Sequence, residues 1–336
     1  MIKKGSPETI RKTTFNFNEF KKAKPEHLKT VKSSFLEWFI GFVEGNGFFI
    51  VSNKKLFFIL NQKEAKVLYF IRKNLGFGKV SLYKEFFRFI VADKKHIDIL
   101  ILLFNGNLVL NKTNAQFESW LQARNTVYHG SENENDLACK RILNDISNVT
   151  TPFPFGCLSF TTVKQEFSNI HDNMQNNHLF GNQIIFKGKN QLSNLINNSW
   201  LSGFIDAEGC FNAQTITEKR YSLGFTVRLR FIVYQKNEND ILKQIKFSFK
   251  SGCITPRLDV ENMFRYTCTD LQALQHVISY LQKHPLHTLK KVSFFRFHKL
   301  LRYITNRKQQ DWTGKVLTRI KNLLKNLNSG FNKIIL

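Results

Sequence analysis

Acidic residues are scarce in this chain. Its 336 residues include 25 Asp and Glu against 50 Lys and Arg, which gives a formal net charge of +25 at pH 7. A charge of this size and sign creates a field that attracts polyanions. The leading class of partner is therefore nucleic acid.

Long hydrophobic runs are also missing. The longest apolar stretches, Ile97 to Phe104 and the segment that begins at Phe39, are too short or are interrupted by Glu and Asn. A membrane-spanning helix needs about 20 consecutive apolar residues. No basic amphipathic helix with a clean apolar face replaces such a span. We therefore expect no membrane partner.

Cysteine is sparse and irregularly spaced. The five cysteines form no CxxC pair and show no metal-type spacing with histidine, which predicts reduced structural thiols and no zinc site. They are Cys139, Cys157, Cys210, Cys253 and Cys268.

Proline and alanine are used little, whereas Phe, Lys, Ile and Asn are used heavily. This bias is typical of coding DNA that is rich in A and T, so we expect a mitochondrial gene, with a chloroplast gene as the alternative. The basic N-terminal 32 residues contain Glu8, Glu19 and Glu26. Transit peptides avoid acids, and we therefore do not interpret this segment as one.

One nine-residue pattern occurs twice, at Phe39 to Gly47 and at Leu201 to Gly209. Each copy is an apolar helical stretch with glycine in its third position, an acid in its sixth, and a final glycine that turns into a strand. A spacing of about 160 residues suits two compact domains, which predicts a tandem duplication. The pattern resembles the LAGLIDADG homing endonuclease family in its single-chain, two-motif form.

The same order of elements follows each motif. The periodicity predicts α-β-β-α-β-β-α in both halves, an α+β fold. The resemblance implies two pseudo-symmetric halves with antiparallel, saddle-shaped sheets and the motif helices packed at the centre. The expected domains are a basic extension (1–32), a first half (33–130), a long linker (131–198), a second half (199–310) and a basic C-terminal helix and tail (311–336).

The second half contains a strand with two distinct faces. From Phe225 to Val233 apolar residues alternate with Thr226, Arg228 and Arg230, which predicts an antiparallel strand with a basic open face. We expect this face and its counterpart in the first half to contact nucleic acid. The candidate contacts are Arg228, Arg230, Lys236, Arg257 and Arg265 in the second half, and Lys54, Lys55, Lys79, Lys84 and Arg88 in the first.

The first half has a shorter hairpin. Glu208 to Gln235 spans 27 residues, whereas Asn46 to Asn61 spans 15. The loss of six residues per strand, at about 3.3 Å each, predicts a hairpin shorter by roughly 20 Å. What remains is apolar on both faces, so we expect it to be covered on both sides, with the N-terminal segment as the candidate cover.

The resemblance also implies where the chemistry lies. Gly41 and Gly203 would let the motif helices approach closely, and the eighth residue of each motif would hold divalent metal. Mg²⁺ prefers carboxylate oxygen, phosphate and water, and it can activate water for phosphodiester hydrolysis. Glu208 suits this role, but its counterpart Asn46 has no charge. Glu44 does not replace it, because two helical positions differ by about 200° around the axis.

Two further pairs resemble the residues that surround the attacking water in this family. They are Lys112 with Lys290, each after a Leu-rich turn, and Asn61 with Gln235. Taken singly, such lysines and amides can equally be solvated surface residues. Their matched placement in the two halves favours the functional reading.

The linker and tails are polar. The linker holds an expected helix at Asn135 to Ile146, a turn at Thr151 to Gly156, and an Asn- and Gln-rich run from Asn169 to Asn198. Such segments are normally disordered. After the second half we expect a basic helix from Val316 to Asn328.

Three functions fit these observations. The favoured one is a former endonuclease that binds structured RNA, as an intron maturase or as a component of an organellar ribonucleoprotein such as the mitochondrial ribosome. The second is an active endonuclease with Mg²⁺ as cofactor, which cuts a long asymmetric duplex. The third is a DNA-binding nickase or repressor. A monomer is expected because both halves lie in one chain.

Overall fold

The computed structural model describes residues 15–129, 183–219, 221, 223–306, 312 and 314–329. These residues form two compact units, one from the described parts of Met1–Ser33 and Asn46–Asn194, the other from those of Ser34–Gly45 and Leu195–Leu336. Motif helix α2 (Ser33–Asn46) therefore packs mostly with the second unit. The expected helix at Asn135 to Ile146 and the turn at Thr151 to Gly156 lie outside the described residues.

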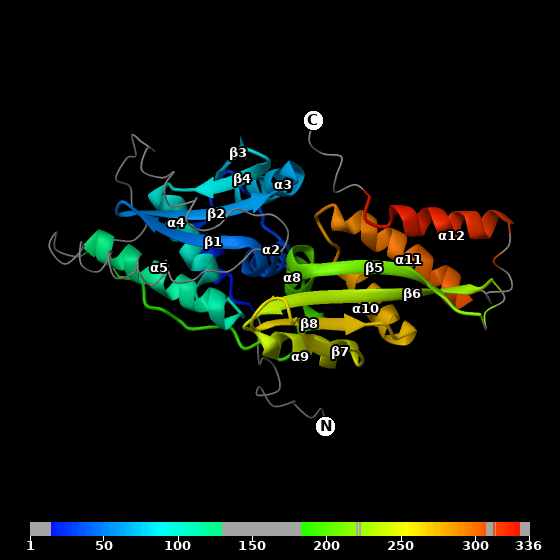
Figure 1. Cartoon of the computed structure of the whole chain (residues 1–336). Coiled ribbons are helices and arrows are strands. Elements are labelled where there is room, and N and C mark those ends of the chain that lie inside the picture. The colour runs from blue at the N-terminus through cyan, green and yellow to red at the C-terminus, as the bar shows by residue number, and fades with distance from the viewer. Residues whose placement is uncertain are drawn as a thin grey trace, which may run out of the picture. The chain divides into compact units, whose positions relative to one another are not determined.

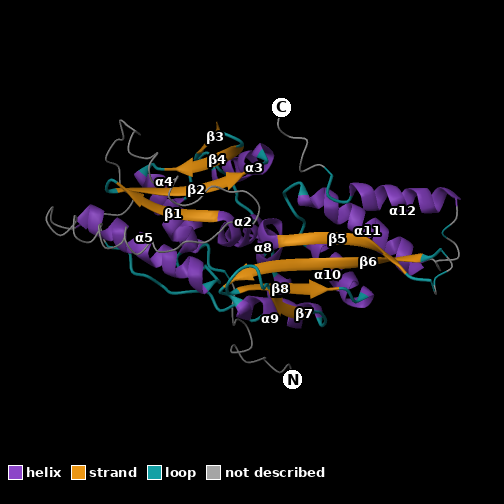
Figure 2. Cartoon of the chain, viewed as in Figure 1, coloured by secondary structure: helices purple, strands orange, loops and turns teal. Residues whose placement is uncertain are grey.

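From each motif helix onward the chain has the predicted order of elements (Figures 1 and 2). The first unit contains α1 (Asn18–Ala23), β1 (Gly47–Ser52), β2 (Lys55–Gln62), α3 (Ala65–Leu75), β3 (Lys79–Tyr83), β4 (Phe86–Val91), α4 (Lys94–Phe104) and α5 (Asn111–His129). The second contains most of α2, then η3 (Leu195–Asn197), α8 (Trp200–Glu208), β5 (Gly209–Thr217), β6 (Phe225–Lys236), α9 (Asn239–Phe249), β7 (Cys253–Pro256), β8 (Met263–Cys268), α10 (Leu271–Lys283), α11 (Lys290–Asn306) and α12 (Gly314–Asn326).

The two sheets have one topology. Their strand orders are β1-β2-β4-β3 and β5-β6-β8-β7, and all neighbours are antiparallel. In each half a helix connects the second strand to the third. The second strand pairs with the fourth, so the third strand lies at the edge of the sheet. The α+β class and the pseudo-symmetric halves are confirmed. None of the described helices has the length and apolarity needed to cross a membrane.

The first hairpin is shorter than the second, as predicted, but the difference in strand length is smaller than expected. Strands β1 and β2 share six paired positions, whereas β5 and β6 share nine. Three missing pairs shorten the ladder by about 10 Å rather than 20 Å. The remaining difference lies at the tip, where Asn53 and Lys54 form a two-residue turn with φ of 49° and 57°, while residues 218–224 connect β5 to β6. Positive φ at both positions is the type I′ geometry of tight hairpins.

Both faces of the first hairpin are buried, as predicted. On one face Phe49 contacts Phe104, Phe117 and Trp120 of the covering helices. The opposite face carries an apolar cluster of Ile50, Phe57 and Ile59, each at most 2% exposed.

The proposed cover for this hairpin is wrong for the described part of the N-terminal extension. Helix α1 packs against α4, with Phe20 fully buried.

Part of the expected linker is ordered. In the first unit, the amides of Asn105 and Asn125 each donate to and accept from the backbone of residues 184–187 in this linker, and the amide of Asn107 bonds the backbone of Asn16 in the N-terminal extension in the same way. The bonds join Asn107 to Asn16, Asn105 to Ile185 and Lys187, and Asn125 to Ile184, at 2.8–3.1 Å.

The second unit has an aromatic core between its sheet and helices. Phe211 of β5 contacts Phe231 of β6 and, on the helical side, Phe294 and Phe297 of α11. The predicted alternation of β6 is confirmed, since Val227, Leu229, Phe231 and Val233 are buried and Arg228 is exposed. One sheet face therefore packs on helices and the other carries the polar residues.

Candidate nucleic-acid interface and motif helices

The motif helices approach each other at their glycines. A Cβ placed on Gly41 would lie 2.0 Å from the carbonyl oxygen of Trp200, and one on Gly203 would lie 1.8 Å from that of Trp38. No side chain fits at such distances. The close approach implied by the resemblance is therefore present, and each glycine faces the backbone of the tryptophan in the other helix.

The same tryptophans bond the sixth-position acids reciprocally. Trp38 Nε1 donates to Asp206 Oδ2 at 2.9 Å, and Trp200 Nε1 donates to Glu44 Oε2. All four side chains are buried. The Glu44 carboxylate therefore joins the two motif helices.

Asp206 has further donors after α10. The amides of His287 and Thr288 donate to its carboxylate at 2.7 and 3.4 Å, and the Thr288 hydroxyl donates as well. Burial raises the pKa of Asp206 above the usual value, although Thr288, His287, Lys290 and Trp38 oppose this. The carboxyl is therefore a structural hub that ties the motif helix to the segment before α11.

Lys290 lies at the end of α8. Its Nζ donates to the carbonyl oxygens of Ile205, Asp206 and Ala207 at 2.8, 2.9 and 3.4 Å. Burial lowers its pKa, while Asp206 and Glu208 raise it. An ammonium has three donors, and a cation at a helix C-terminus also complements the helix dipole. Lys290 thus caps the motif helix. Lys112, its counterpart, is a half-buried residue in the first turn of α5.

Glu208 and Asn46 are the final residues of α8 and α2. A Cβ on Gly45, the residue before Asn46, would lie 3.2 Å from Glu208 Oε1. Helices α2 and α8 therefore remain in contact as far as their C-terminal ends. Within the described chain, no three His, Cys, Asp or Glu side chains come together as metal ligands. Because Asn46 has an amide where the family pattern has an acid, the residues present do not fit the paired-carboxylate metal site that the family implies.

The match between Asn61 and Gln235 is off by one residue. Gly47 pairs with Leu60 and Gly209 with Val233, so the strand register places Gln62, not Asn61, opposite the position of Gln235. The missing ladder pairs and tip residues amount to eleven, not twelve, and a shift of one residue moves a side chain to the other face of a strand. Asn61 instead accepts a hydrogen bond of 3.1 Å from Arg88 Nε.

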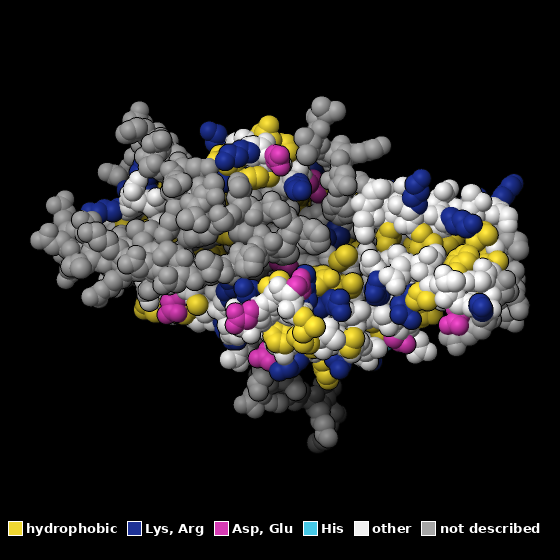
Figure 3. Space-filling view, in the orientation of Figure 1, with side chains coloured by type: hydrophobic (Ala, Val, Ile, Leu, Met, Phe, Trp, Pro, Cys, Tyr) yellow, Lys and Arg dark blue, Asp and Glu magenta, His cyan; other side chains and the backbone are white. Residues whose placement is uncertain are grey.

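The outer face of the second sheet is polar and basic. Arg230 is opposite Asn212 and donates to its Oδ1 at 3.0 and 3.1 Å, while Arg228 is opposite Gln214 and exposed. Lys236 at the end of β6 and Arg265 on the neighbouring strand β8 are half-buried. Figure 3 shows Lys and Arg side chains spread over the second unit on the side seen there.

The remaining predicted cations differ in access. Lys54, Lys55, Lys79 and Lys84 of the first unit are exposed. Arg257 bonds Asp259, so its charge is paired.

Arg88 does not have the surface position that was predicted for it. Only 6% of this residue is exposed, and its guanidinium lies 4.3 Å from the centre of the Tyr83 ring. Burial lowers its pKa. The prediction that it contacts nucleic acid does not fit this placement, because the guanidinium is buried against Asn61 and the Tyr83 and Phe86 rings.

The sequence interpretation missed the two tryptophans. Each stands three residues before the motif glycine, so the repeat itself contained the signal. The bonds from His287 and Thr288 to Asp206 had no such signal, because they join residues about 80 positions apart.

Comparison with known proteins agrees with this geometry. The sequence profile of the LAGLIDADG endonucleases matches residues 39–124 and 201–301, which include both motifs and more than half of the chain. The structure of LAGLIDADG homing endonuclease I-GzeII in complex with its DNA target is similar, with a TM-score of 0.65 and 19% identity over 90% of this chain and 100% of that one. Meganuclease I-AabMI bound to uncleaved DNA gives a TM-score of 0.62 and 21% identity over 88% of this chain and 99% of that one.

Two of the similar curated proteins come from fungi. The probable intron-encoded endonuclease 4 of Neurospora crassa is 27% identical over 90% of this chain, which spans only 46% of that protein. An uncharacterized cox1 intron-2 protein of 37.2 kDa from Schizosaccharomyces pombe is 26% identical over 96% of this chain and 81% of its own length. With two motif helices, two matching sheets and a profile match over most of both halves, the chain belongs to the LAGLIDADG endonuclease family.

Proposed function

We propose that this protein binds structured RNA and does not cut both strands of a DNA duplex. The observation that carries the proposal is the difference between the two sheets. The second sheet has a polar, basic outer face, whereas the first is apolar and buried around Ile50, Phe57 and Ile59. A long asymmetric duplex needs two polar sheets along its groove, and this chain offers one.

The motif chemistry supports the loss of double-strand cleavage. Asn46 has no charge where the family pattern places an acid, and Lys290 uses its donors on the carbonyls that end α8. No step through a metal pair follows from these residues.

RNA is the favoured ligand because its recognition depends on phosphate, shape and unpaired bases rather than on the groove of a long straight duplex. A net charge of +25 supplies the phosphate affinity. Relatives named after introns, one of them in cox1, support a mitochondrial, intron-linked gene. An intron RNA is therefore the first target to test.

The test measures binding of the full chain to a folded intron RNA and to a random duplex DNA library, each with and without Mg²⁺. We expect tight, salt-dependent RNA binding that Glu208→Gln leaves unchanged, because binding would not use the metal carboxylate. Glu261→Gln, at an exposed position before β8, is the matched control. Enrichment of a duplex that is cut in both strands, with cutting lost in Glu208→Gln, would overturn the proposal.

A second candidate is cleavage of one DNA strand, which is favoured by Glu208, because it keeps the motif carboxylate that Asn46 lacks. A supercoiled plasmid that contains an enriched duplex would then become open-circular in Mg²⁺ without becoming linear. Under the main proposal it stays supercoiled.

A further inference from the structure

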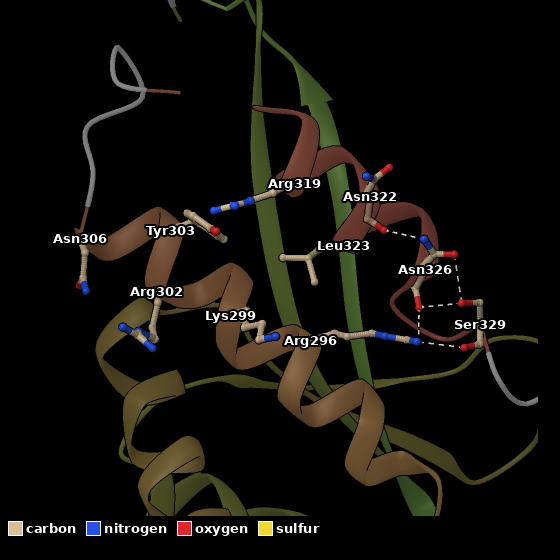
Figure 4. Close-up of a pocket in the computed structure, with 10 residues that line it drawn as sticks. All are labelled: Arg296, Lys299, Arg302, Tyr303, Asn306, Arg319, Asn322, Leu323, Asn326 and Ser329. Carbon is tan, nitrogen blue, oxygen red and sulfur yellow. Dashed lines mark hydrogen bonds between the residues drawn. The ribbon is translucent and has the colours of Figure 1, made fainter. Parts of the chain in front are cut away.

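A groove of about 950 Å³ lies between α11 and α12 in the second unit (Figure 4). Its lining is almost entirely polar and basic. The lining residues are Arg296, Lys299, Arg302, Tyr303, Asn306, Arg319, Asn322, Leu323, Asn326 and Ser329.

The two helices carry five and four Lys or Arg residues, and neither contains an Asp or Glu. Arg296 has a structural task, because its Nη1 donates to the carbonyl oxygens of Asn326 and Ser329 (2.8 Å for the latter) and so fixes the end of α12. Lys299, Arg302 and Arg319 form no ion pair with any acid in the part of the chain that the structure describes. Three cations therefore face the groove without a counterion from the described protein.

The groove also contains groups that recognise bases. Arg319 of α12 and Tyr303 of α11 extend toward each other across it, and Leu323 points between the helices (Figure 4). Aromatic rings stack on bases of any sequence, and arginine adds charge and planarity. The amides of Asn306 and Asn322 supply donors and acceptors for base edges. Cations, one aromatic ring and amides together match a nucleotide better than they match a small anion.

The groove is separate from the basic face of the sheet. Phe294 and Phe297 of α11 pack on Phe211, on the side of the strands opposite Arg230, because successive strand residues point to opposite faces. The basic sheet face and the groove therefore lie on opposite sides of the sheet, and one short nucleic-acid segment does not contact both. The apolar side of α12 packs on the protein, since Ile320 is 1% exposed and the other apolar side chains of the helix are half-buried, which disfavours a lipid surface as the ligand.

We infer that the groove between α11 and α12 binds unpaired nucleotides of an RNA, with Tyr303 stacking on a base and Lys299, Arg302 and Arg319 contacting phosphates. This inference rests on the proposed binding of RNA and adds a second site to it. Folded RNA would be held on the sheet face by its backbone and on the helical side by a single-stranded segment.

The test uses the full chain and a labelled oligouridine RNA of about 20 nucleotides, with binding measured by fluorescence anisotropy over a range of salt. Arg302→Ala with Arg319→Ala should weaken binding at least about tenfold and lower the salt slope by about two ions. Tyr303→Leu should weaken it about fivefold or more with no change in slope. Lys315→Ala with Lys325→Ala removes the same charge from exposed positions of α12 outside the groove and is the matched control.

The outcomes separate this inference from the proposed function. If Arg228→Ala with Arg230→Ala abolishes binding of folded RNA but spares oligouridine, both stand. If oligouridine binds at the groove while folded RNA shows no preference over duplex DNA, the groove stands and the proposed function fails. Equal losses in the groove and control variants, or groove-dependent binding to phosphatidylserine vesicles in place of oligouridine, would overturn the groove assignment.

Discussion

The indole of Trp38 donates a hydrogen bond of 2.9 Å to Asp206 in the other motif helix, and Trp200 returns the same bond to Glu44. The two bonds flank the contacts of Gly41 and Gly203. Glycine lets the backbones touch, and the buried bonds fix how far each helix is advanced along the other. The helix pair is thereby held in one register by polar groups rather than by side-chain volume.

The first prediction concerns Asp206→Asn. The carboxylate accepts from two backbone amides, a hydroxyl and the Trp38 indole, so an amide NH₂ would face at least one donor. We expect the free energy of unfolding to fall by about 2 kcal/mol in urea titration. Asp259→Asn, at an exposed acid, should leave the free energy of unfolding almost unchanged. Equal effects in the two variants would contradict the buried network.

The second prediction concerns Gly41→Ala. The new Cβ would lie 2.0 Å from the carbonyl oxygen of Trp200. This oxygen belongs to the backbone of α8, which can move away only if the two helices separate. We expect a loss of about 3 kcal/mol or more. Gly224→Ala is the control, because it also adds one methyl group but has nothing within 4 Å and only its φ of +69° as a cost. That cost should be about 1 kcal/mol, so similar melting temperatures in the two variants would argue against tight helix contact.

The third prediction concerns pH. Burial, aided by Lys291, lowers the pKa of His287 from 6.5 to about 4. The folded state therefore favours the neutral ring, and the stability gained from this is complete above pH 6.5 and is lost as the pH falls toward 4. Because the ring is partly exposed, we expect the wild type to lose about 1–2 kcal/mol more than His287→Gln between pH 7 and pH 4.5.

The raised pKa of Asp206 acts in the opposite direction, since protonation on acidification then favours the folded state, but it is present in both proteins and cancels in the difference. Parallel stability curves for the wild type and His287→Gln would show that His287 titrates normally.

Much of this fold could be predicted from sequence because its signals are local. The apolar alternation from Phe225 to Val233 predicted a strand that the structure extends by only three residues, to Lys236. The register of the first hairpin could not be predicted. Its second strand is a continuous apolar run, Leu56 to Leu60, and such a run has no alternation that shows which residues pair and how many form the turn. Arg88 was misjudged for a related reason: a basic residue on a strand looks exposed until the opposite face is known to be covered.

The fourth prediction concerns the sheet face. Arg228 and Arg230 stand on the open side of β6, and phosphate contacts release counterions. Arg228→Ala with Arg230→Ala should lower the salt slope of folded-RNA binding by about two. Lys54→Ala with Lys55→Ala, at the tip of the shortened hairpin, should lower the salt slope less. The apolar sheet face beside this tip offers no contacts to the RNA phosphates. Affinity that is insensitive to salt in the wild type would contradict binding through phosphates.

The most direct test of the proposed function is to crosslink the protein in the cells that express it, recover its nucleic acid and sequence it after treatment with RNase or DNase. We predict a discrete structured RNA that RNase releases, whose identity would distinguish an intron from ribosomal RNA. Recovery of a discrete intronless DNA site, bound or freshly cut in both strands, would contradict the proposal and would mean that Asn46 and the covered first sheet do not prevent cleavage.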